Sequence, residues 1–275
     1  MKNKILILGN GFIANRLHKN IEKNTIICPQ RINSFKVADR IFKKYKPAIA
    51  INCIGSIGRR NVDDCEINKD KTLLSNSYAP IILAEAAIRH KLKLIHIGSG
   101  CIFHYDYSSD RPISECKIPD CFDLFYSRSK IYAERVLEVL SSSNSILIVR
   151  PRIPLDCMPY PKNLLTKLLN FKKVIDIPNS VTYMPDFIEA LKHLITIDAR
   201  GIYNVVNKGT LRYPVLLDVY KRFVPDFKYK ILNYNKLKLK RSNLILSVRK
   251  LERSGFKVRS INQILEECVK NYIKF

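Results

Sequence analysis

A glycine-rich turn directly after the first apolar run places the strongest constraint on the fold of this chain. Residues 5–8 read ILIL, and residues 9–14 follow as GNGFIA, a G-x-G-x-x-A pattern that opens a helical stretch. Such a turn lets the backbone approach a pyrophosphate, whose charge the amides at the helix N-terminus stabilise. After the first strand of an alternating chain, the pattern predicts a dinucleotide-binding site. Its expected contacts are Gly9, Asn10, Gly11, Phe12 and Ile13.

Strand-like and helix-like patterns alternate along the first half of the chain. Buried strands are expected at Ile5–Leu8, Thr25–Cys28, Ala48–Ile54, Leu92–Ile97 and Ser145–Val149. Helices are expected at Ile13–Ile21, Phe35–Tyr45, Thr72–His90 and Tyr126–Leu140, the third of them kinked or restarted at Pro80. This alternation is typical of a parallel sheet covered on both faces. The sequence therefore predicts an α/β fold with a Rossmann-like, doubly wound parallel sheet.

Prolines become frequent from Pro151 onward, which predicts that the chain leaves the sheet to build a smaller C-terminal substrate lobe. Gly201–Val206 reads as one more sheet strand, so this lobe is expected to be interleaved with the sheet. The expected cofactor domain comprises residues 1–155, with about 181–210 returning to it, and the substrate lobe comprises 156–180 and 211–275.

The composition narrows the functional classes. The chain of 275 residues has a formal net charge of +24, but its basic residues are dispersed, without the aromatic-interleaved stripe typical of nucleic-acid binding. Its eight cysteines form no C-x-x-C pair, so we expect reduced thiols and neither a metal site nor a disulfide framework. No apolar run is long enough for a signal peptide or a membrane span. We expect a cytoplasmic protein with no nucleic-acid and no membrane partner.

The end of the second expected strand bears on the choice of dinucleotide. Cys28-Pro29-Gln30-Arg31 offers no Asp or Glu for a free ribose hydroxyl, whereas Arg31 is available for a 2′-phosphate. NADP(H) is therefore favoured over NAD(H), with NADH as the alternative. The other interpretation is that Arg31 is simply an exposed surface residue.

A Tyr-x-x-x-Lys pattern, Tyr126 to Lys130, opens the helix before the fifth strand. At a spacing of four the two side chains share a helix face, so the ammonium can lower the phenol pKa from about 10. Tyr234 and Lys238 have the same spacing, but Tyr126 also follows Ser99, which ends the fourth strand at the ligand-binding edge of the sheet. Tyr126 is therefore predicted to be the proton donor.

These features together resemble the extended short-chain dehydrogenase/reductases. The resemblance rests on the N-terminal turn, Asn52-Cys53-Ile54-Gly55 after the third strand, Ser99, and the Tyr126 and Lys130 pair. More narrowly, seven motifs resemble the plant-type bifunctional nucleotide-rhamnose synthases, which are 3,5-epimerase/4-keto-reductases. They are INCIG, NVDDCE, GSGCIF, FYSRSK, VRPRIPL, NLLTK and IPNSVT, and the resemblance spans about residues 5 to 250.

The resemblance implies a homodimeric enzyme that reduces a nucleotide-linked 4-keto-6-deoxy sugar with NADPH, converting UDP-4-keto-6-deoxy-glucose to UDP-L-rhamnose. Ser99 would hydrogen-bond the C4 carbonyl, Tyr126 would protonate the forming alkoxide, and Lys130 would hold the nicotinamide ribose and tune Tyr126. Tyr126 and Lys130 would thus also contact the cofactor. Further cofactor contacts implied by the resemblance are Asn52, Cys53, Ile54 and Gly55.

Cys101 and Lys167 fall on the cysteine and lysine that form the epimerising acid/base pair in the resembling family. Inverting a centre beside a carbonyl requires proton removal on one face and proton delivery on the other, for which a thiol and a desolvated lysine are suitable. The alternative is that Cys101 is a small buried hydrophobe, and the protein would then be a 4-keto-reductase only.

Two departures from the family pattern keep other functions open. Ala14 replaces the last glycine of the usual turn, which is also one residue shorter, and Tyr107–Leu124, part of the expected wall over the sugar, matches poorly. A 2-acetamido-4-keto nucleotide sugar, epimerised at C3 alone, is therefore an alternative substrate. A non-catalytic NADP-binding protein is an alternative from a different class, and the intact Ser99, Tyr126 and Lys130 argue against it.

Overall fold

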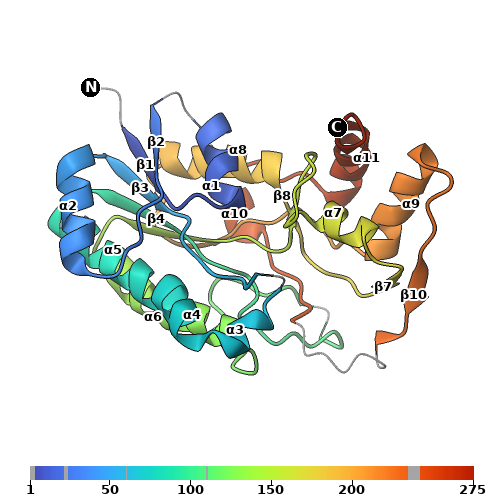
Figure 1. Ribbon diagram of the computed structural model, residues 1–275, viewed down its shortest axis with the longest axis horizontal. Helices are drawn as coiled ribbons and strands as arrows, with labels where there is room; N and C mark the ends of the chain where they lie inside the picture. Colours follow the sequence, from blue (N-terminus) through green and yellow to red (C-terminus); the bar gives the residue numbers. More distant parts are fainter. Residues whose placement is uncertain (1–3, 22–23, 60, 110, 235–241) are drawn as a thin grey trace. The chain divides into compact units, whose positions relative to one another are not determined.

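The computed structural model describes residues 4–21, 24–59, 61–109, 111–234 and 242–275 (Figure 1). The chain divides into two compact units. The first comprises Met1–Ile102, Pro119–Arg150 and Lys192–Tyr203, and the second comprises Phe103–Ile118, Pro151–Leu191 and Asn204–Phe275. Residues 103–118, 151–155, 181–191 and 204–210 belong to the second unit, whereas the sequence pattern assigned them to the cofactor domain. The functional division into a cofactor domain and a substrate lobe stays a prediction.

A six-stranded sheet forms the centre of the first unit, in the order β2-β1-β3-β4-β5-β9. The strands are β1 (Ile5–Leu8), β2 (Thr25–Cys28), β3 (Ile49–Asn52), β4 (Lys93–Ile97), β5 (Ile146–Arg150) and β9 (Gly201–Asn204). β1 pairs with β2 and β3, and β4 pairs with β3 and β5, all in parallel. The predicted doubly wound α/β fold is confirmed.

Helices cover the sheet of the first unit. They are α1 (Phe12–Asn20), α2 (Phe35–Tyr45), α3 (Asp64–Ile67), α4 (Lys69–Leu73), α5 (Ala79–Arg89) and α6 (Phe125–Ser141). α2 and α5 bring Phe42 and Leu83 to the sheet face that carries Leu6, Leu8 and Ala50. α1 packs on β1 and β2 from the other side (Figure 1). Strands buried on both faces read as continuous apolar runs, which explains the sequence pattern.

The helix expected over Thr72–His90 is interrupted near Pro80, as the sequence predicts. A π-helical turn, η1 (Leu74–Tyr78), runs into α5, which carries Pro80 in its first turn. Proline has no backbone N–H, and its ring crowds the carbonyl of the fourth residue before it, here Asn76. The wider π turn accommodates this crowding, and such turns are frequent at functional sites.

The last strand of the sheet comes late in the chain. α8 (Met184–Thr196) begins in the second unit and ends in the first, and β9 follows it. The turn between them carries Asp198 and Ala199, whose side-chain and backbone oxygens accept hydrogen bonds from Lys93 Nζ at 2.6 and 2.8 Å. Because Lys93 is buried, its ammonium depends on the partners that this late segment supplies.

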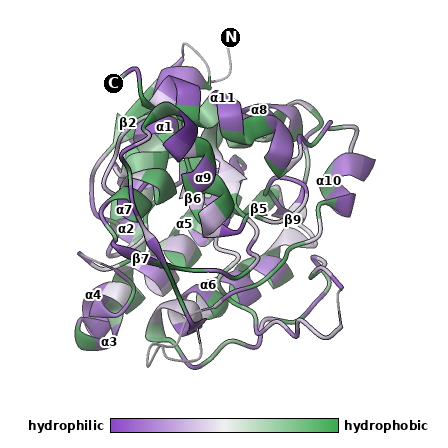
Figure 2. Ribbon diagram, turned by 90° about the vertical axis from the view of Figure 1, so that its right-hand side faces the viewer, coloured by the Kyte–Doolittle hydropathy of each residue, from purple (hydrophilic) through white to green (hydrophobic). Residues whose placement is uncertain are grey.

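The second unit is built from short strands and amphipathic helices. They are β6 (Pro154–Leu155), α7 (Leu164–Leu169), β7 (Lys173–Ile175), β8 (Thr182–Tyr183), α9 (Tyr213–Phe223), β10 (Lys230–Leu232), α10 (Arg249–Arg253) and α11 (Ile261–Tyr272). The core gathers apolar side chains of α7, α9 and α11, including Leu165, Leu217 and Leu265. In Figure 2 the ribbon of α11 alternates between hydrophobic and hydrophilic residues, as expected of a helix that buries one face.

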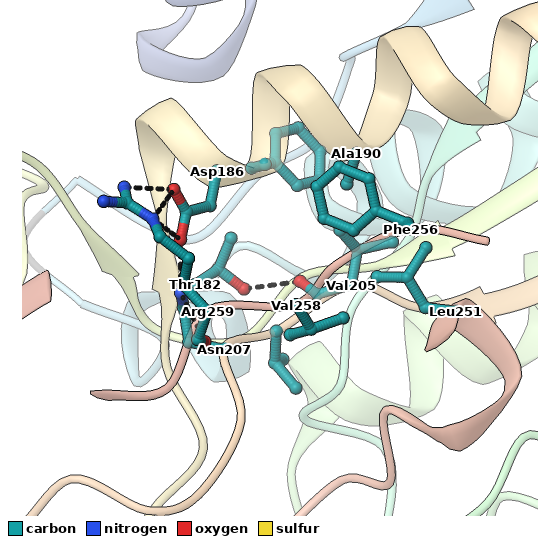
Figure 3. A pocket seen from close by; sticks show the side chains of 11 residues that line it. Thr182, Asp186, Ala190, Val205, Asn207, Leu251, Phe256, Val258 and Arg259 are labelled. Carbon is teal, nitrogen blue, oxygen red and sulfur yellow. Dashed lines mark hydrogen bonds and ion pairs between the residues drawn. The ribbon is translucent and has the colours of Figure 1, made fainter. Parts of the chain in front are cut away.

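A small hollow in the second unit is framed by charged side chains (Figure 3). Arg259 forms an ion pair with Asp186 and another with Glu267, the latter at 2.6 Å. Asn207 Nδ2 donates to Asp186 Oδ2 at 2.6 Å, and much of the remaining wall is apolar, including Phe256. Because Arg259 pairs with both carboxylates within the fold, we interpret the hollow as a structural feature that ties α8 to the segment before α11.

Candidate active site

The loops after β1 and β3 meet closely at the carboxyl edge of the sheet. β1 and β3 are neighbours in the strand order, and parallel sheets of this order bind ligands at that point. Gly9 has φ +102°, a conformation that favours glycine, and a Cβ added there would lie 3.3 Å from backbone atoms of Cys53 and Ile54. Glycine at position 9 therefore allows the two loops to approach each other.

The turn from β1 into α1 leaves open space where a pyrophosphate would need it. A Cβ added to Gly11 would meet nothing within 4 Å, so the fold itself does not require glycine there. Asn15 Nδ2 donates to the carbonyl oxygens of Asn10 and Gly11 at 2.7 and 3.0 Å, which holds the turn in shape. Phe12 and Ile13 follow in the first turn of α1. The predicted contacts Gly9 to Ile13 thus form one cradle that fits a dinucleotide pyrophosphate.

Asn52 fixes the loop that follows β3. Its Oδ1 accepts from the backbone N–H of Ile54 at 3.0 Å, and its Nδ2 donates to His96 Nδ1 on β4 at 3.1 Å. Burial, with a smaller contribution from the Lys130 charge, holds the pKa of His96 well below its usual value, so the ring is neutral and can accept. Burial also raises the pKa of the Cys53 thiol to about 12, so Cys53 stays protonated. The cofactor contacts of Asn52, Cys53 and Ile54 stay predictions.

Ser99, Tyr126 and Lys130 are brought together in the first unit. The Tyr126 hydroxyl donates to Ser99 Oγ at 3.3 Å, and Ser99 Oγ also accepts from the backbone N–H of Cys101 at 3.1 Å. Lys130 lies one turn after Tyr126 on the continuous helix α6. The exposed fractions of Ser99, Tyr126 and Lys130 are 5%, 7% and 6%, so their polar atoms interact in a poorly solvated site.

Lys130 is held in a narrow space beside the loop after β3. Burial lowers its pKa to about 8. A Cβ added to Gly55 would lie 3.0 Å from Lys130 Nζ and 3.4 Å from Asn76 Oδ1, so glycine at position 55 makes room for the ammonium. Asn76, in the π turn, accepts from the Ser56 N–H at 2.7 Å and donates to Ser129 Oγ at 3.0 Å. The sequence analysis did not identify Asn76, although Pro80, four residues later, indicates the irregular helical turn in which Asn76 lies.

Glu66 and Ser127 hold α6 and the loop that carries Cys101 in position. The sequence analysis did not identify either residue. Leu124 offers no side-chain cap to α6, and Glu66 instead accepts from the backbone N–H of Phe125 at 2.6 Å. A carboxylate at a helix N-terminus also interacts favourably with the helix dipole. Ser127 Oγ donates to the Cys101 carbonyl at 2.6 Å. Glu66 ends the motif NVDDCE and Ser127 lies in the motif FYSRSK, both of which resemble the known family. These motifs therefore contain the residues whose contacts help to position Tyr126.

The two predicted epimerisation residues belong to different units. Cys101 is half-buried and packs with Cys65, Phe125 and Tyr126 in the first unit. Lys167 lies on α7 in the second unit, where burial, and secondarily the charge of Lys162, lowers its pKa. A lowered pKa makes more of the basic amine available near neutrality. The roles of Cys101 and Lys167 stay predictions.

Arg31 is exposed after β2, and its role in binding a 2′-phosphate stays a prediction. Tyr234 accepts a hydrogen bond from Asn243 in the second unit, whereas Lys238 lies outside the described residues.

Among the described side chains, no three His, Cys, Asp or Glu gather as they would around a metal ion. Within the same ranges no helix has the length and hydropathy to cross a membrane.

The arrangement can support reduction of a carbonyl. A buried phenol lies against a serine hydroxyl, one helical turn from an ammonium, and the adjacent turn at Gly9 and Gly11 can hold a dinucleotide. A proton donor with charge beside it stabilises the alkoxide that forms when hydride adds to a ketone. No part of this chemistry requires a metal ion.

Curated proteins from Arabidopsis thaliana are similar to this chain. A trifunctional UDP-glucose 4,6-dehydratase/UDP-4-keto-6-deoxy-D-glucose 3,5-epimerase/UDP-4-keto-L-rhamnose-reductase is 31% identical over 242 residues, 84% of this chain and 36% of that protein. A bifunctional dTDP-4-dehydrorhamnose 3,5-epimerase/reductase is 31% identical over 245 residues, 85% of this chain and 79% of that protein. The chain thus spans about a third of the length of the trifunctional relative.

Two solved structures share the fold. The L780 UDP-rhamnose synthase of Acanthamoeba polyphaga mimivirus aligns with a TM-score of 0.89 at 22% identity, over 98% of this chain and 99% of that one. A dTDP-4-dehydrorhamnose reductase of Bacillus anthracis in complex with NADP aligns with a TM-score of 0.82 at 20% identity, over 100% and 99%. The family model described as the RmlD substrate binding domain matches residues 3–211. That match takes in the turn at Gly9 and the Tyr126 helix alike, and the chain belongs to the RmlD substrate-binding-domain family.

Proposed function

We propose that the protein is an NADPH-dependent 3,5-epimerase/4-keto-reductase that converts UDP-4-keto-6-deoxy-glucose to UDP-L-rhamnose. The observation that carries the proposal is the buried hydrogen bond from Tyr126 to Ser99, one helical turn from Lys130. Membership of the RmlD family supports the reductase part. The choice of uridine is supported by the names of two similar proteins, the trifunctional plant enzyme and the viral synthase.

The reduction follows from the chemistry of three side chains. NADPH, when bound, supplies the hydride that adds to the C4 carbonyl carbon. Ser99 donates a hydrogen bond to the carbonyl oxygen, and Tyr126 transfers its phenolic proton to that oxygen as negative charge develops there. The Lys130 ammonium favours the phenolate that remains and so makes Tyr126 a stronger acid. Proton and hydride together convert the ketone to the alcohol.

The epimerisation requires two further proton carriers. Protons at C3 and C5 are acidified by the neighbouring C4 carbonyl, so a base can remove one and an acid on the opposite face can return another. Cys101 and Lys167 are proposed for these tasks because both match the resembling family and because the lowered pKa of Lys167 suits a base. Each inversion returns one proton for the one removed, so no oxidant is needed.

The cofactor proposal rests on the fit of the cradle at the β1 and β3 loops. Gly9 to Ile13 would hold the pyrophosphate, and Arg31 would contact the 2′-phosphate of NADPH. Tyr126, Lys130 and the loop Asn52 to Gly55 would face the nicotinamide half. The NADP complex of the similar bacterial reductase supports this choice.

Arg31→Ala is expected to weaken NADPH binding and to leave NADH binding nearly unchanged, because only NADPH carries the 2′-phosphate. Gly11→Ala is the matched comparison: its Cβ meets nothing within 4 Å in the fold but would occupy the pyrophosphate space, so both cofactors should bind less tightly. Fluorescence titration of each variant with NADPH and NADH makes the measurement. If Arg31→Ala lowers the affinity for NADPH and NADH equally, Arg31 does not bind the 2′-phosphate.

One incubation tests the function directly. The purified protein is mixed with NADPH and, in parallel, with UDP-4-keto-6-deoxy-glucose, its dTDP analogue or a 2-acetamido-4-keto UDP-sugar, and the products are identified by NMR. We expect UDP-L-rhamnose as the preferred product. A 6-deoxy-D-hexose would identify a reductase without epimerase activity, and turnover of the acetamido sugar alone would identify that alternative. If NADPH binds but no keto-sugar is reduced, the protein is a non-catalytic NADP-binding protein.

Homodimer formation and a cytoplasmic location complete the proposal. Tyr132, Val136 and Val139 form an exposed stripe along α6, which an identical subunit would cover. Light scattering should give about twice the chain mass of 31.8 kDa, and a value at the chain mass would contradict the dimer. All eight cysteines are free thiols, which supports a reducing compartment, and cell fractionation would detect a different location.

A further inference from the structure

α6 carries a second buried charge beyond Lys130. Glu134 follows Lys130 by one helical turn, and Arg150 ends β5 opposite it. Arg150 Nε contacts both carboxylate oxygens of Glu134 at 3.1 Å, and Arg150 Nη2 contacts Oε1 at 2.6 Å. The exposed fractions of the two side chains are 1% for Arg150 and 3% for Glu134. A fully buried, forked ion pair thus begins one helical turn beyond Lys130.

Burying two charged side chains costs desolvation free energy, so the position of this ion pair between α6 and β5 needs a physical reason. The loop after β4 closes over it: a Cβ added to Gly98 would lie 3.5 Å from Glu134 Oε2 and 3.3 Å from the Val149 carbonyl oxygen. The pKa of Glu134 is raised on balance, because burial outweighs the charge and hydrogen bonds of Arg150, which lower it. The forked contact nevertheless gives both carboxylate oxygens a cationic partner. Arg150 therefore favours the ionised form of Glu134 in a site that water reaches poorly.

The ionised Glu134 acts on Lys130. Burial is the largest influence on the pKa of Lys130 and lowers it, while the charge of Glu134 is the largest influence in the opposite direction. Tyr126 lies one helical turn before Lys130 on α6. The other titratable groups that act on Lys130 come from several elements: Cys53 after β3, Cys65 on α3, Cys101 after β4, and His96 on β4. Burial keeps His96 neutral and raises the thiol pKa of Cys53 and Cys65, so these three carry no charge near neutral pH.

We propose that Glu134, held by Arg150, is a positioning residue for the reduction: its carboxylate, one helical turn from Lys130, favours the charged form of Lys130 that acts on Tyr126. This role deepens the proposed function and rests on it. The active site would then contain a chain of alternating charges, from Arg150 through Glu134 to Lys130, that ends at the phenol.

The test titrates Lys130 itself and needs no substrate. The reactivity of Lys130 toward acetic anhydride is followed by mass spectrometry from pH 5 to 10, in the wild-type protein and in Glu134→Gln. Removing the carboxylate destabilises the ammonium, so the pKa of Lys130 should fall and the amine should appear at lower pH. At a pH well below the pKa of Lys130, each unit by which this pKa falls raises the fraction of neutral amine about tenfold. We therefore expect Glu134→Gln to raise the amine fraction of Lys130 at pH 6 by at least about tenfold. With NADPH and a keto-sugar, the alkaline limb of kcat should move to lower pH in parallel.

Two controls separate this role from a structural one. Glu138→Gln removes an exposed carboxylate of the same helix, paired with Arg135, and should leave the Lys130 titration unchanged. The double variant Glu134→Gln with Arg150→Met removes both buried charges, so it should recover the melting temperature that Glu134→Gln alone loses by leaving Arg150 buried without its carboxylate. Its Lys130 titration should remain shifted. A double variant whose Lys130 titrates as in the wild type would overturn the proposal, whether or not the protein proves to be a reductase.

Discussion

Tyr126→Phe is expected to lower the rate of keto-sugar reduction about 10² to 10⁴-fold, the usual contribution of a general acid. The substitution removes the hydroxyl that donates to Ser99 and keeps the ring that packs with Cys65 and Phe125. The fold and the turn at Gly9 should therefore be preserved, and NADPH should bind as tightly as to the wild type. Stopped-flow measurement of NADPH oxidation, with fluorescence titration of NADPH, gives both quantities.

Tyr234→Phe is the matched control for this prediction. Tyr234 belongs to the second unit and accepts a hydrogen bond from Asn243, so losing its hydroxyl should leave the rate of reduction nearly unchanged. A loss of only about twofold in Tyr126→Phe would remove Tyr126 from the mechanism, because it is far below the contribution of a general acid. A loss of NADPH binding in Tyr126→Phe would show that the hydroxyl also holds the cofactor, which contradicts the expected unchanged affinity.

Cys101→Ser and Lys167→Ala are expected to separate epimerisation from reduction. A hydroxyl is a far weaker acid and base than a thiol near neutral pH, so Cys101→Ser should suppress the exchange of C3 and C5 protons with solvent. Lys167→Ala should do likewise, because it removes the other proposed proton carrier. Both variants should still oxidise NADPH when they are given a keto-sugar that is already epimerised, since Tyr126 is the proposed proton donor at C4.

The measurement is deuterium incorporation at C3 and C5 in D₂O, followed by NMR with the 4-keto substrate and no reduced cofactor. Cys116→Ser changes an exposed thiol and serves as the control, with exchange expected at the wild-type rate. If Cys101→Ser also exchanges deuterium at that rate, its thiol packs and does not catalyse. The protein would then be a 4-keto-reductase that depends on a separate epimerase.

The sheet of the first unit could be predicted because its four central strands, β1, β3, β4 and β5, are buried along their whole length. The run Ala48–Ile54 shows where such a prediction loses accuracy: the paired strand is Ile49–Asn52, because Asn52 Oδ1 takes up the Ile54 N–H and turns the chain out of the sheet. The strands of the second unit could not be predicted from the sequence in the same way. Strands such as β6 and β8 have two residues each, which is too short for an alternating pattern to appear.

Within the candidate site, the residues that carry a local pattern were the ones the sequence revealed. Tyr126 and Lys130 are neighbours on one helix, so their spacing alone relates them. Glu66 and Asn76 could not be found in this way, because each acts on a partner far away in the chain, the first on Phe125 and the second on Ser56 and Ser129. A polar residue of this kind is indistinguishable in sequence from one that faces solvent.

The position of β9 in the chain also governs the order in which the protein can fold during synthesis. When Arg150 has left the ribosome, β5 is still an edge strand, and Lys93 has not yet met Asp198 and Ala199. The segment that covers this edge is made only after residues 151–191 of the second unit. A nascent chain that stalls in that interval would expose the unpaired edge of the apolar strand β5, and such edges favour aggregation during folding.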